Sequence, residues 1–130
     1  MGSGTGYQCR TCGTRFEAEE GGGFFFDLLH CDGCGRADSV AHSEMGDVHL
    51  AYVKGLKTPY AIARAEMDRE IQQTHQGQPI DEAAYHAAVE RQVPVCACGG
   101  TFTYAARPRC PRCGSTEEQW APTGEHVFYD

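Results

Sequence analysis

Short runs of apolar and aromatic residues between glycine-rich turns characterise both ends of this chain. Residues 24–30 (FFFDLLH) follow three consecutive glycines. Such a run bounded by glycine is typical of a β-strand with a turn before it. Residues 101–104 (TFTY) predict another strand, and the alternating tail 120–129 predicts a strand at a sheet edge.

The middle of the chain changes to helical spacing. Thr58 is a candidate N-cap and Pro59 a candidate first helical residue. The residues that follow at helical spacing are Tyr60, Ala63, Met67, Ile71 and Thr74. A second helix is predicted over 81–92, after a Gly/Pro turn, with Ala84, Tyr85, Ala88 and Val89 on one face. Together they predict a helical hairpin whose apolar stripes pack on each other and on the strands.

Strongly hydrophobic residues are too few to explain a stable fold. Leu, Ile, Val and Phe supply 20 of the 130 residues. That is about 15%, below the ~20% at which a chain with appreciable net charge begins to look disordered. The formal net charge is −7. We therefore expect bound metal to supply much of the stability.

Eight cysteines form four close pairs, which are Cys9 and Cys12, Cys31 and Cys34, Cys96 and Cys98, and Cys110 and Cys113. We find no candidate signal peptide or membrane span, so we expect a cytoplasmic protein, and in a reducing compartment paired cysteines are metal ligands. Glycine after each pair permits the positive φ that turns backbone amides toward the sulfurs. The shorter step between Cys96 and Cys98 predicts an altered turn there.

Sequential pairing of these cysteines closes the shortest loops. Cys9 and Cys12 would join Cys31 and Cys34 across residues 13–30, and Cys96 and Cys98 would join Cys110 and Cys113 across 99–109. Short loops cost less chain entropy than long ones. We expect two Zn²⁺ ions per chain, because closed four-cysteine sites are typical of structural zinc, although iron could occupy the same ligands.

Each close cysteine pair with its following turn, which we call a knuckle, is the part of the chain that resembles known families. Residues 7–17 (YQCRTCGTRFE) resemble the opening of FmdB-type regulatory zinc ribbons and, more broadly, rubredoxin-like ribbons. The C-terminal motifs, Cys-x-Cys-Gly-Gly-x-Phe and Cys-Pro-x-Cys-Gly-Ser, are similar to generic bacterial ribbon modules. The likeness covers about ten residues around each knuckle and implies nucleic-acid or protein contacts by fold analogy alone.

These observations predict a small metal-stabilised α+β fold, with two four-cysteine zinc ribbons built on β-hairpins flanking a helical hairpin. The expected segments are a flexible N-terminus at 1–5, ribbon 1 at 6–48, a helical insertion at 49–92 and ribbon 2 at 93–130. His30, beside Cys31, is expected to be a strand residue or a donor to a ligand. His75 and His86 are interpreted as ordinary polar positions.

The leading functional hypothesis is a non-catalytic adaptor that binds an unidentified protein. Two zinc sites closed by four cysteines leave no open coordination position, and we find no phosphate loop or hydrolase motif, so we expect no enzyme activity and no small-molecule substrate. The alternative is a nucleic-acid-binding or transcription-associated ribbon protein that uses Arg107, Arg109 and Arg112 beside Phe102 and Tyr104. Two filled tetrathiolate sites would bring the net charge to about −11, which disfavours that alternative.

Overall fold

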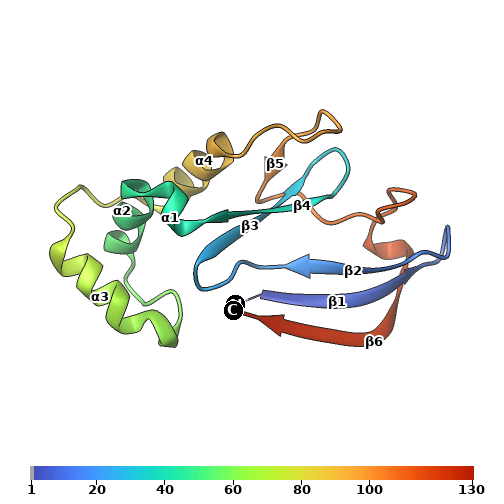
Figure 1. Cartoon of the computed structure of the whole chain (residues 1–130), viewed down its shortest axis with the longest axis horizontal. Helices are drawn as coiled ribbons and strands as arrows, with labels where there is room; N and C mark the ends of the chain where they lie inside the picture. The colour runs from blue at the N-terminus through green and yellow to red at the C-terminus, as the bar shows by residue number, and fades with distance from the viewer. Residues whose placement is uncertain (1) are drawn as a thin grey trace.

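The computed structural model describes residues 2–130 as a small α+β fold with two three-stranded sheets (Figure 1). The strands are β1 (Gly2–Cys9), β2 (Arg15–Glu20), β3 (Phe26–Cys31), β4 (Ala37–Ala41), β5 (Phe102–Thr103) and β6 (Trp120–Tyr129). The α-helices are α1 (His42–Met45), α2 (Asp47–Gly55), α3 (Ala65–Thr74) and α4 (Glu82–Gln92), and two 3₁₀ turns are η1 (Ile62–Arg64) and η2 (Glu117–Gln119).

The first sheet joins the two ends of the described chain. Its order is β2-β1-β6, with β1 antiparallel to both neighbours. Gly2 pairs with Tyr129 at one end of the β1–β6 ladder, and Cys9 pairs with Trp120 at the other. Residues 2–5, expected to be a flexible N-terminus, are therefore part of the central strand. The tail forms an edge strand, as its alternation predicts.

The second sheet has the order β4-β3-β5 and carries two of the cysteine knuckles. β3 and β4 form a hairpin in which Phe26 pairs with Ala41. β3 begins two residues later than the aromatic run predicts. β5 is only two residues long, and its Phe102 pairs with Cys31. This short ladder connects the N-terminal and C-terminal parts of the chain.

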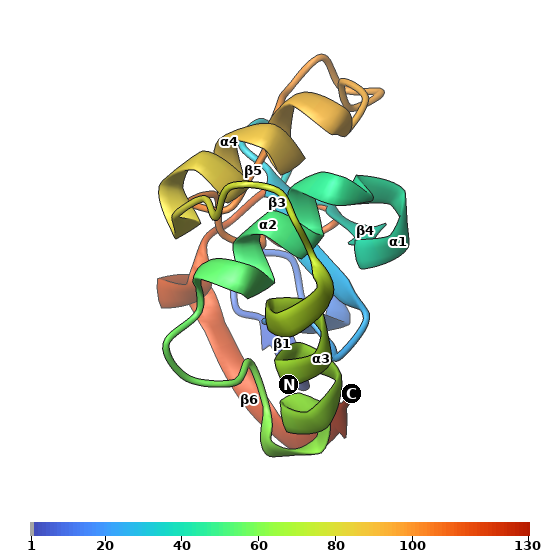
Figure 2. The same ribbon diagram turned by 90° about the vertical axis from the view of Figure 1, so that its left-hand side faces the viewer.

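The α-helices gather at the left-hand end of the molecule in Figure 1, the end that faces the viewer in Figure 2. α1 and α2 lie in a stretch for which no helix was predicted. The predicted start at Thr58 is wrong, because Ala61 is still extended and the 3₁₀ turn η1 precedes α3. α4 matches the prediction, and the Asp81 side chain caps it by accepting a hydrogen bond from the Ala84 amide at 2.8 Å. α2 packs against both α3 and α4, so the two predicted helices share it as a common neighbour.

Two separate apolar clusters support these elements. The larger one includes Leu29, Val40, Tyr85, Val89 and Phe102, and it joins β3, β4, β5 and α4. The smaller one includes Ala18 and Trp120, with Tyr7 and Phe16 packed against it. Each cluster contains buried cysteines. Within the described residues, no helix is long and apolar enough to cross a membrane.

Candidate metal centres

The eight cysteines meet in two groups of four that could hold metal ions. The outer cluster, as we call it, is made of Cys9, Cys12, Cys110 and Cys113. The inner cluster is made of Cys31, Cys34, Cys96 and Cys98. Each cluster therefore combines one pair from the N-terminal third with one from the C-terminal third. The predicted sequential pairing is wrong, because it joins the four pairs in the other combination.

Strand pairing explains why the longer loops close. Loop-closure entropy grows only with the logarithm of length, at about 0.6 kcal/mol per doubling. The ladder between β1 and β6 ends at Cys9 and Trp120, which places the outer knuckles side by side. The pairing of Cys31 with Phe102 does the same for the inner knuckles. Backbone hydrogen bonds and apolar burial along these ladders outweigh a loop penalty of a few kcal/mol.

The sulfur positions fit a tetrahedral ion. In the outer cluster the Sγ atoms of Cys9 and Cys113 are 3.5 Å apart, and those of Cys12 and Cys110 are 3.6 Å apart. In the inner cluster Cys31 to Cys98 is 3.5 Å and Cys34 to Cys96 is 3.7 Å. A tetrahedron with metal–sulfur bonds of about 2.3 Å has edges of about 3.8 Å. Both donor sets therefore fit a closed four-sulfur site.

Three knuckles share one backbone arrangement. The amides of Cys9, Cys31 and Cys110 donate to the carbonyl oxygen five residues later, and each cysteine carbonyl accepts from the amide four residues later. In the fourth knuckle Cys96 donates to Gly100 and accepts from Gly99, so the turn is one residue tighter. The glycine after each pair has a positive φ, between 74° and 90°. The predicted positive φ of these glycines and the altered fourth turn are both confirmed.

Hydrogen bonds from the knuckles favour thiolate at specific sulfurs. The Ser115 hydroxyl, 3.1 Å from the sulfur, lowers the pKa of Cys9 to about 6. Burial raises the pKa of Cys31, but the Cys34 and Gly33 amides outweigh it and lower that pKa to about 7. The Gly100 amide lowers the pKa of Cys98, but neighbouring thiols outweigh it and raise this pKa to about 12. Four adjacent thiolates need a cation, so metal binding would displace the remaining protons.

The arginines of the proposed nucleic-acid patch have other partners. Arg107 forms ion pairs with Glu20 and with Glu117. Arg109 donates from Nη2 to the Asp32 carbonyl oxygen at 3.3 Å, which links the outer knuckle to the inner one. Arg112 is exposed at the tip of an outer knuckle. Of the flanking aromatics, Phe102 is buried and Tyr104 stacks on His86, so neither ring is a free stacking platform.

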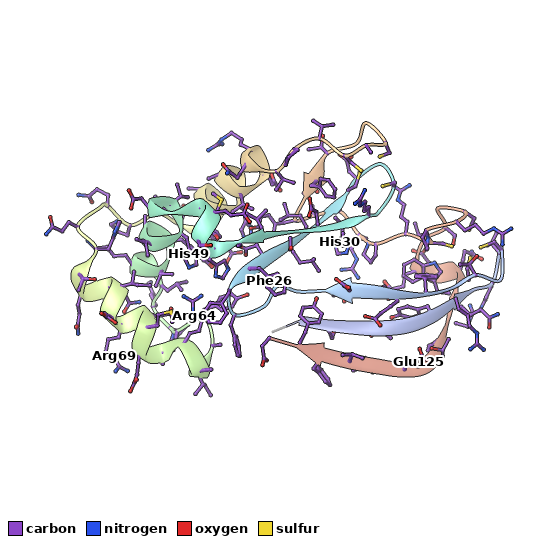
Figure 3. The ribbon with its side chains drawn as sticks, viewed as in Figure 1. Phe26, His30, His49, Arg64, Arg69 and Glu125 are labelled. Carbon is purple, nitrogen blue, oxygen red and sulfur yellow. The ribbon has the colours of Figure 1, made fainter. Side chains whose placement is uncertain are left out.

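A buried polar cluster between the helices and β3 was missed by the sequence analysis. Tyr85 donates to Asp27 Oδ2 at 2.6 Å, and His42 Nε2 lies 3.4 Å from the same oxygen. His49 Nδ1 lies 3.3 Å from the Tyr85 hydroxyl. Because Tyr85 gives its only proton to Asp27, Nδ1 of His49 must be the donor in that contact. Figure 3 labels His49 at this position between the helices and the sheet.

Arg64 and Asp68 extend this cluster into the helices. Arg64 donates to the Phe24 carbonyl oxygen at 2.8 Å and lies 3.2 Å from His42 Nδ1. Its Nη2 is 3.3 Å from Asp68 Oδ1. Both ionic side chains are nearly inaccessible, with Arg64 4% and Asp68 1% exposed. The predicted apolar stripe of this helix is therefore wrong, since Asp68 faces inward while Met67 is exposed.

Sequence signals for this cluster are weak. His42 and His49 are seven residues apart, and Arg64 and Asp68 four apart, which places each pair on one helical face if a helix is assumed. No helix was expected around His42, so there was no reason in the sequence to place His42 and His49 on the same face. His30 lies in β3, as expected for a strand residue, and its Nε2 has no hydrogen-bond partner among residues 2–130.

Comparison with known proteins gives one match. The family described as "Domain of unknown function (DUF8255)" matches residues 5–119. This range contains all eight cysteines and the polar cluster. The comparisons with curated proteins and with solved structures gave no match.

Proposed function

We propose that this chain, which belongs to the DUF8255 family, is a non-catalytic zinc-binding module that presents a surface to a protein partner. The pair of four-sulfur clusters is the observation that supports metal binding. Cysteine-only tetrahedral sets suit zinc or iron, and closed zinc sites of this kind serve structure. A catalytic zinc keeps one position open, which a fourth cysteine would fill.

Zinc can be tested by native mass spectrometry with elemental analysis of the purified protein. We expect two zinc ions per chain. One metal per chain, or iron at full occupancy, would contradict the assignment. Structural zinc contributes on the order of 10 kcal/mol of binding free energy in small domains, which would offset the small hydrophobic core.

A patch of exposed apolar side chains near α3 supports the adaptor role. It contains Phe25, 60% exposed, Ile62, 94%, and Met67, 45%. Phe25 and Met67 both lie beside Arg64, since its guanidinium carbon is 5.8 Å from the Phe25 ring centre and its Nη2 is 3.6 Å from the Met67 sulfur, and Ile62 lies two positions before Arg64 in η1. Exposed apolar patches of this kind mark interaction surfaces.

The adaptor role can be tested by affinity capture from an extract of the source cells, followed by reconstitution with the purified captured protein. We expect Phe25→Ser with Ile62→Ser to abolish capture, because these side chains would be buried in the interface. Val95→Ser is a matched control, since Val95 is 70% exposed on the segment that precedes Cys96. Equal capture by all variants would contradict a role for this patch.

The nucleic-acid alternative has less support. Two of its three arginines have protein partners, and carboxylates lie beside Arg107. An acidic surface also repels polyphosphate at long range. Capture of nuclease-sensitive material in place of a protein would favour this alternative.

A further inference from the structure

A cavity of about 330 Å³ lies above the buried polar cluster, between β3, α2 and α4. This volume is at the lower end of the ~300–1,000 Å³ range of small-molecule sites. Its wall includes Asp27, His42, His49, Tyr52 and Tyr85, and Glu82 also lines it from the exposed start of α4. The cavity belongs to neither cysteine cluster. We propose that it binds a small organic ammonium ion, with Asp27 as the counter-ion.

Two side chains of the cavity wall, Asp27 and His49, each have an acceptor atom without a side-chain donor among residues 2–130. Asp27 Oδ2 faces Tyr85 and His42, whereas no side chain among residues 2–130 donates to Oδ1. His49 is 7% exposed, and its Nε2 has no partner within the same residues. Since Nδ1 holds the imidazole proton toward Tyr85, Nε2 carries a free lone pair. An ammonium group, which only donates, matches these acceptors.

The charges around the cavity favour a cation. Arg64 lines it but is paired with Asp68, and Glu20 is paired with Arg107. Within residues 2–130, neither Asp27 nor Glu82 forms an ion pair with a lysine or an arginine. His42 does not supply a cationic partner, because Arg64 can only donate to its Nδ1, which places the imidazole proton on Nε2. The site therefore carries an excess of negative charge.

The aromatic wall supplies the second part of the recognition. Tyr52 stacks on Tyr85 with ring centres 4.4 Å apart, and Tyr60 meets His42 edge to face at 6.1 Å. Tyr104 also lines the cavity. Aromatic faces attract ammonium ions through their quadrupoles. A cation with a short apolar or aromatic arm suits this wall.

The test uses benzylammonium, benzyl alcohol and benzoate, which share a ring and differ in charge. Each is titrated into the metal-loaded full chain, and binding is followed from backbone amide NMR shifts. We expect saturable shifts around Asp27, His49 and Glu82 with benzylammonium, at least about tenfold tighter than with benzyl alcohol, because a hydrogen bond to a charged group is strong. Benzoate should not bind.

Three variants make the test specific. Asp27→Asn keeps the shape and removes the charge, so we expect benzylammonium affinity to fall at least about tenfold. Glu82→Gln, at the exposed mouth, should weaken it by about two- to threefold. Glu70→Gln on α3 lies outside the cavity and should change nothing.

Several results would overturn the proposal. Absence of saturable shifts with benzylammonium, equal binding of benzyl alcohol, or tighter binding of benzoate would each do so. Unchanged affinity in folded Asp27→Asn would also do so. If Asp27→Asn fails to fold, the ligand series and Glu82→Gln still decide the question. The metal content and the protein partner are measured separately, so these outcomes do not depend on the proposed function.

Discussion

Gly35, which follows Cys34 of the inner cluster, and Arg109, which precedes Cys110 of the outer cluster, lie in direct backbone contact, although 74 positions separate them in sequence. A Cβ atom placed on Gly35 would lie 2.4 Å from the Arg109 amide nitrogen. Gly35 also has a φ of 77°, which side chains rarely adopt. This contact and the hydrogen bond from Arg109 to the Asp32 carbonyl oxygen connect the knuckles of the inner and outer clusters.

Gly35→Ala should therefore be more destabilising than Gly114→Ala. Gly114 has a similar φ of 74°, but nothing lies within 4 Å of its Cβ position. We expect Gly114→Ala to cost about 1 kcal/mol from backbone strain alone, and Gly35→Ala to cost at least about 2 kcal/mol more. Urea unfolding of the metal-loaded proteins measures both. Equal losses would show that the contact between the clusters is not tight.

The cluster assignment predicts which cysteines act together. Cys12→Ser and Cys113→Ser should each remove one metal of two and perturb the same amides, those of β1, β2 and β6. Cys98→Ser should remove the other metal and perturb β3, β5 and α4, because Cys31 and Cys96 of the same cluster belong to the larger apolar core. Native mass spectrometry and amide NMR are the measurements. Shared effects of Cys113→Ser and Cys98→Ser would instead favour sequential pairing.

Asp68→Ala should be strongly destabilising. It leaves the Arg64 guanidinium buried without a carboxylate, and breaking a buried ion pair typically costs 3–5 kcal/mol, so a loss of about that size is expected. Glu66→Ala on the exposed side of α3 is the matched control and should stay within about 0.5 kcal/mol. Urea unfolding followed by circular dichroism compares the two. A loss below about 1 kcal/mol in Asp68→Ala would mean that the pair is hydrated.

His49 should make the fold less stable in mild acid. Burial is the main reason why the pKa of His49 falls to about 4 from an ordinary value of 6.5, and the nearby Arg64 charge adds to it. The unfolded chain takes up this proton near pH 6.5 and the folded chain does not. Stability present above pH 6.5 is therefore lost as the pH falls toward 4, by an amount on the order of 2–3 kcal/mol.

Imidazole NMR of the metal-loaded protein tests this pH dependence directly. Between pH 7.5 and 5.5 the His49 signals should not titrate and should report the Nδ1–H tautomer. Metal content is checked at each pH, because acid also protonates the cysteines. An imidazolium at His49 by pH 6 would contradict the buried, hydrogen-bonded geometry.

The arginine patch predicts a negative result with nucleic acid. Because Arg107 and Arg109 have protein partners, we expect no micromolar binding of short DNA or RNA at moderate salt. Fluorescence anisotropy with the parent and with the Arg107→Ala, Arg109→Ala, Arg112→Ala triple variant tests this, with Arg69→Ala on α3 as control. Micromolar binding lost only in the triple variant, with a log–log salt slope of about −0.7 per contact on single strands, would restore the alternative.

Local chemistry was readable from the sequence, and long-range pairing was not. The knuckles depend on a few adjacent residues, so Cys31, Cys34 and Gly35 predict their own turn. Asp81 likewise predicts the start of α4. The partner of each knuckle depends on strand ladders such as Cys9 with Trp120, which leave no local signal. The inward side of α3 was missed because Arg64 and Asp68 are polar, and apolar periodicity cannot detect a buried ion pair.

The nesting of the two clusters also sets an order of assembly. Residues 13–109 separate the two knuckles of the outer cluster, a span of 97 residues. Once the inner cluster forms, most of that span is already closed. Only residues 13–30 and 99–109 are then left in the loop that the outer cluster must close. Since closure entropy follows loop length, the first metal shortens the chain that the second must close. Metal uptake would therefore be sequential and cooperative, with the inner ion preparing the site of the outer one.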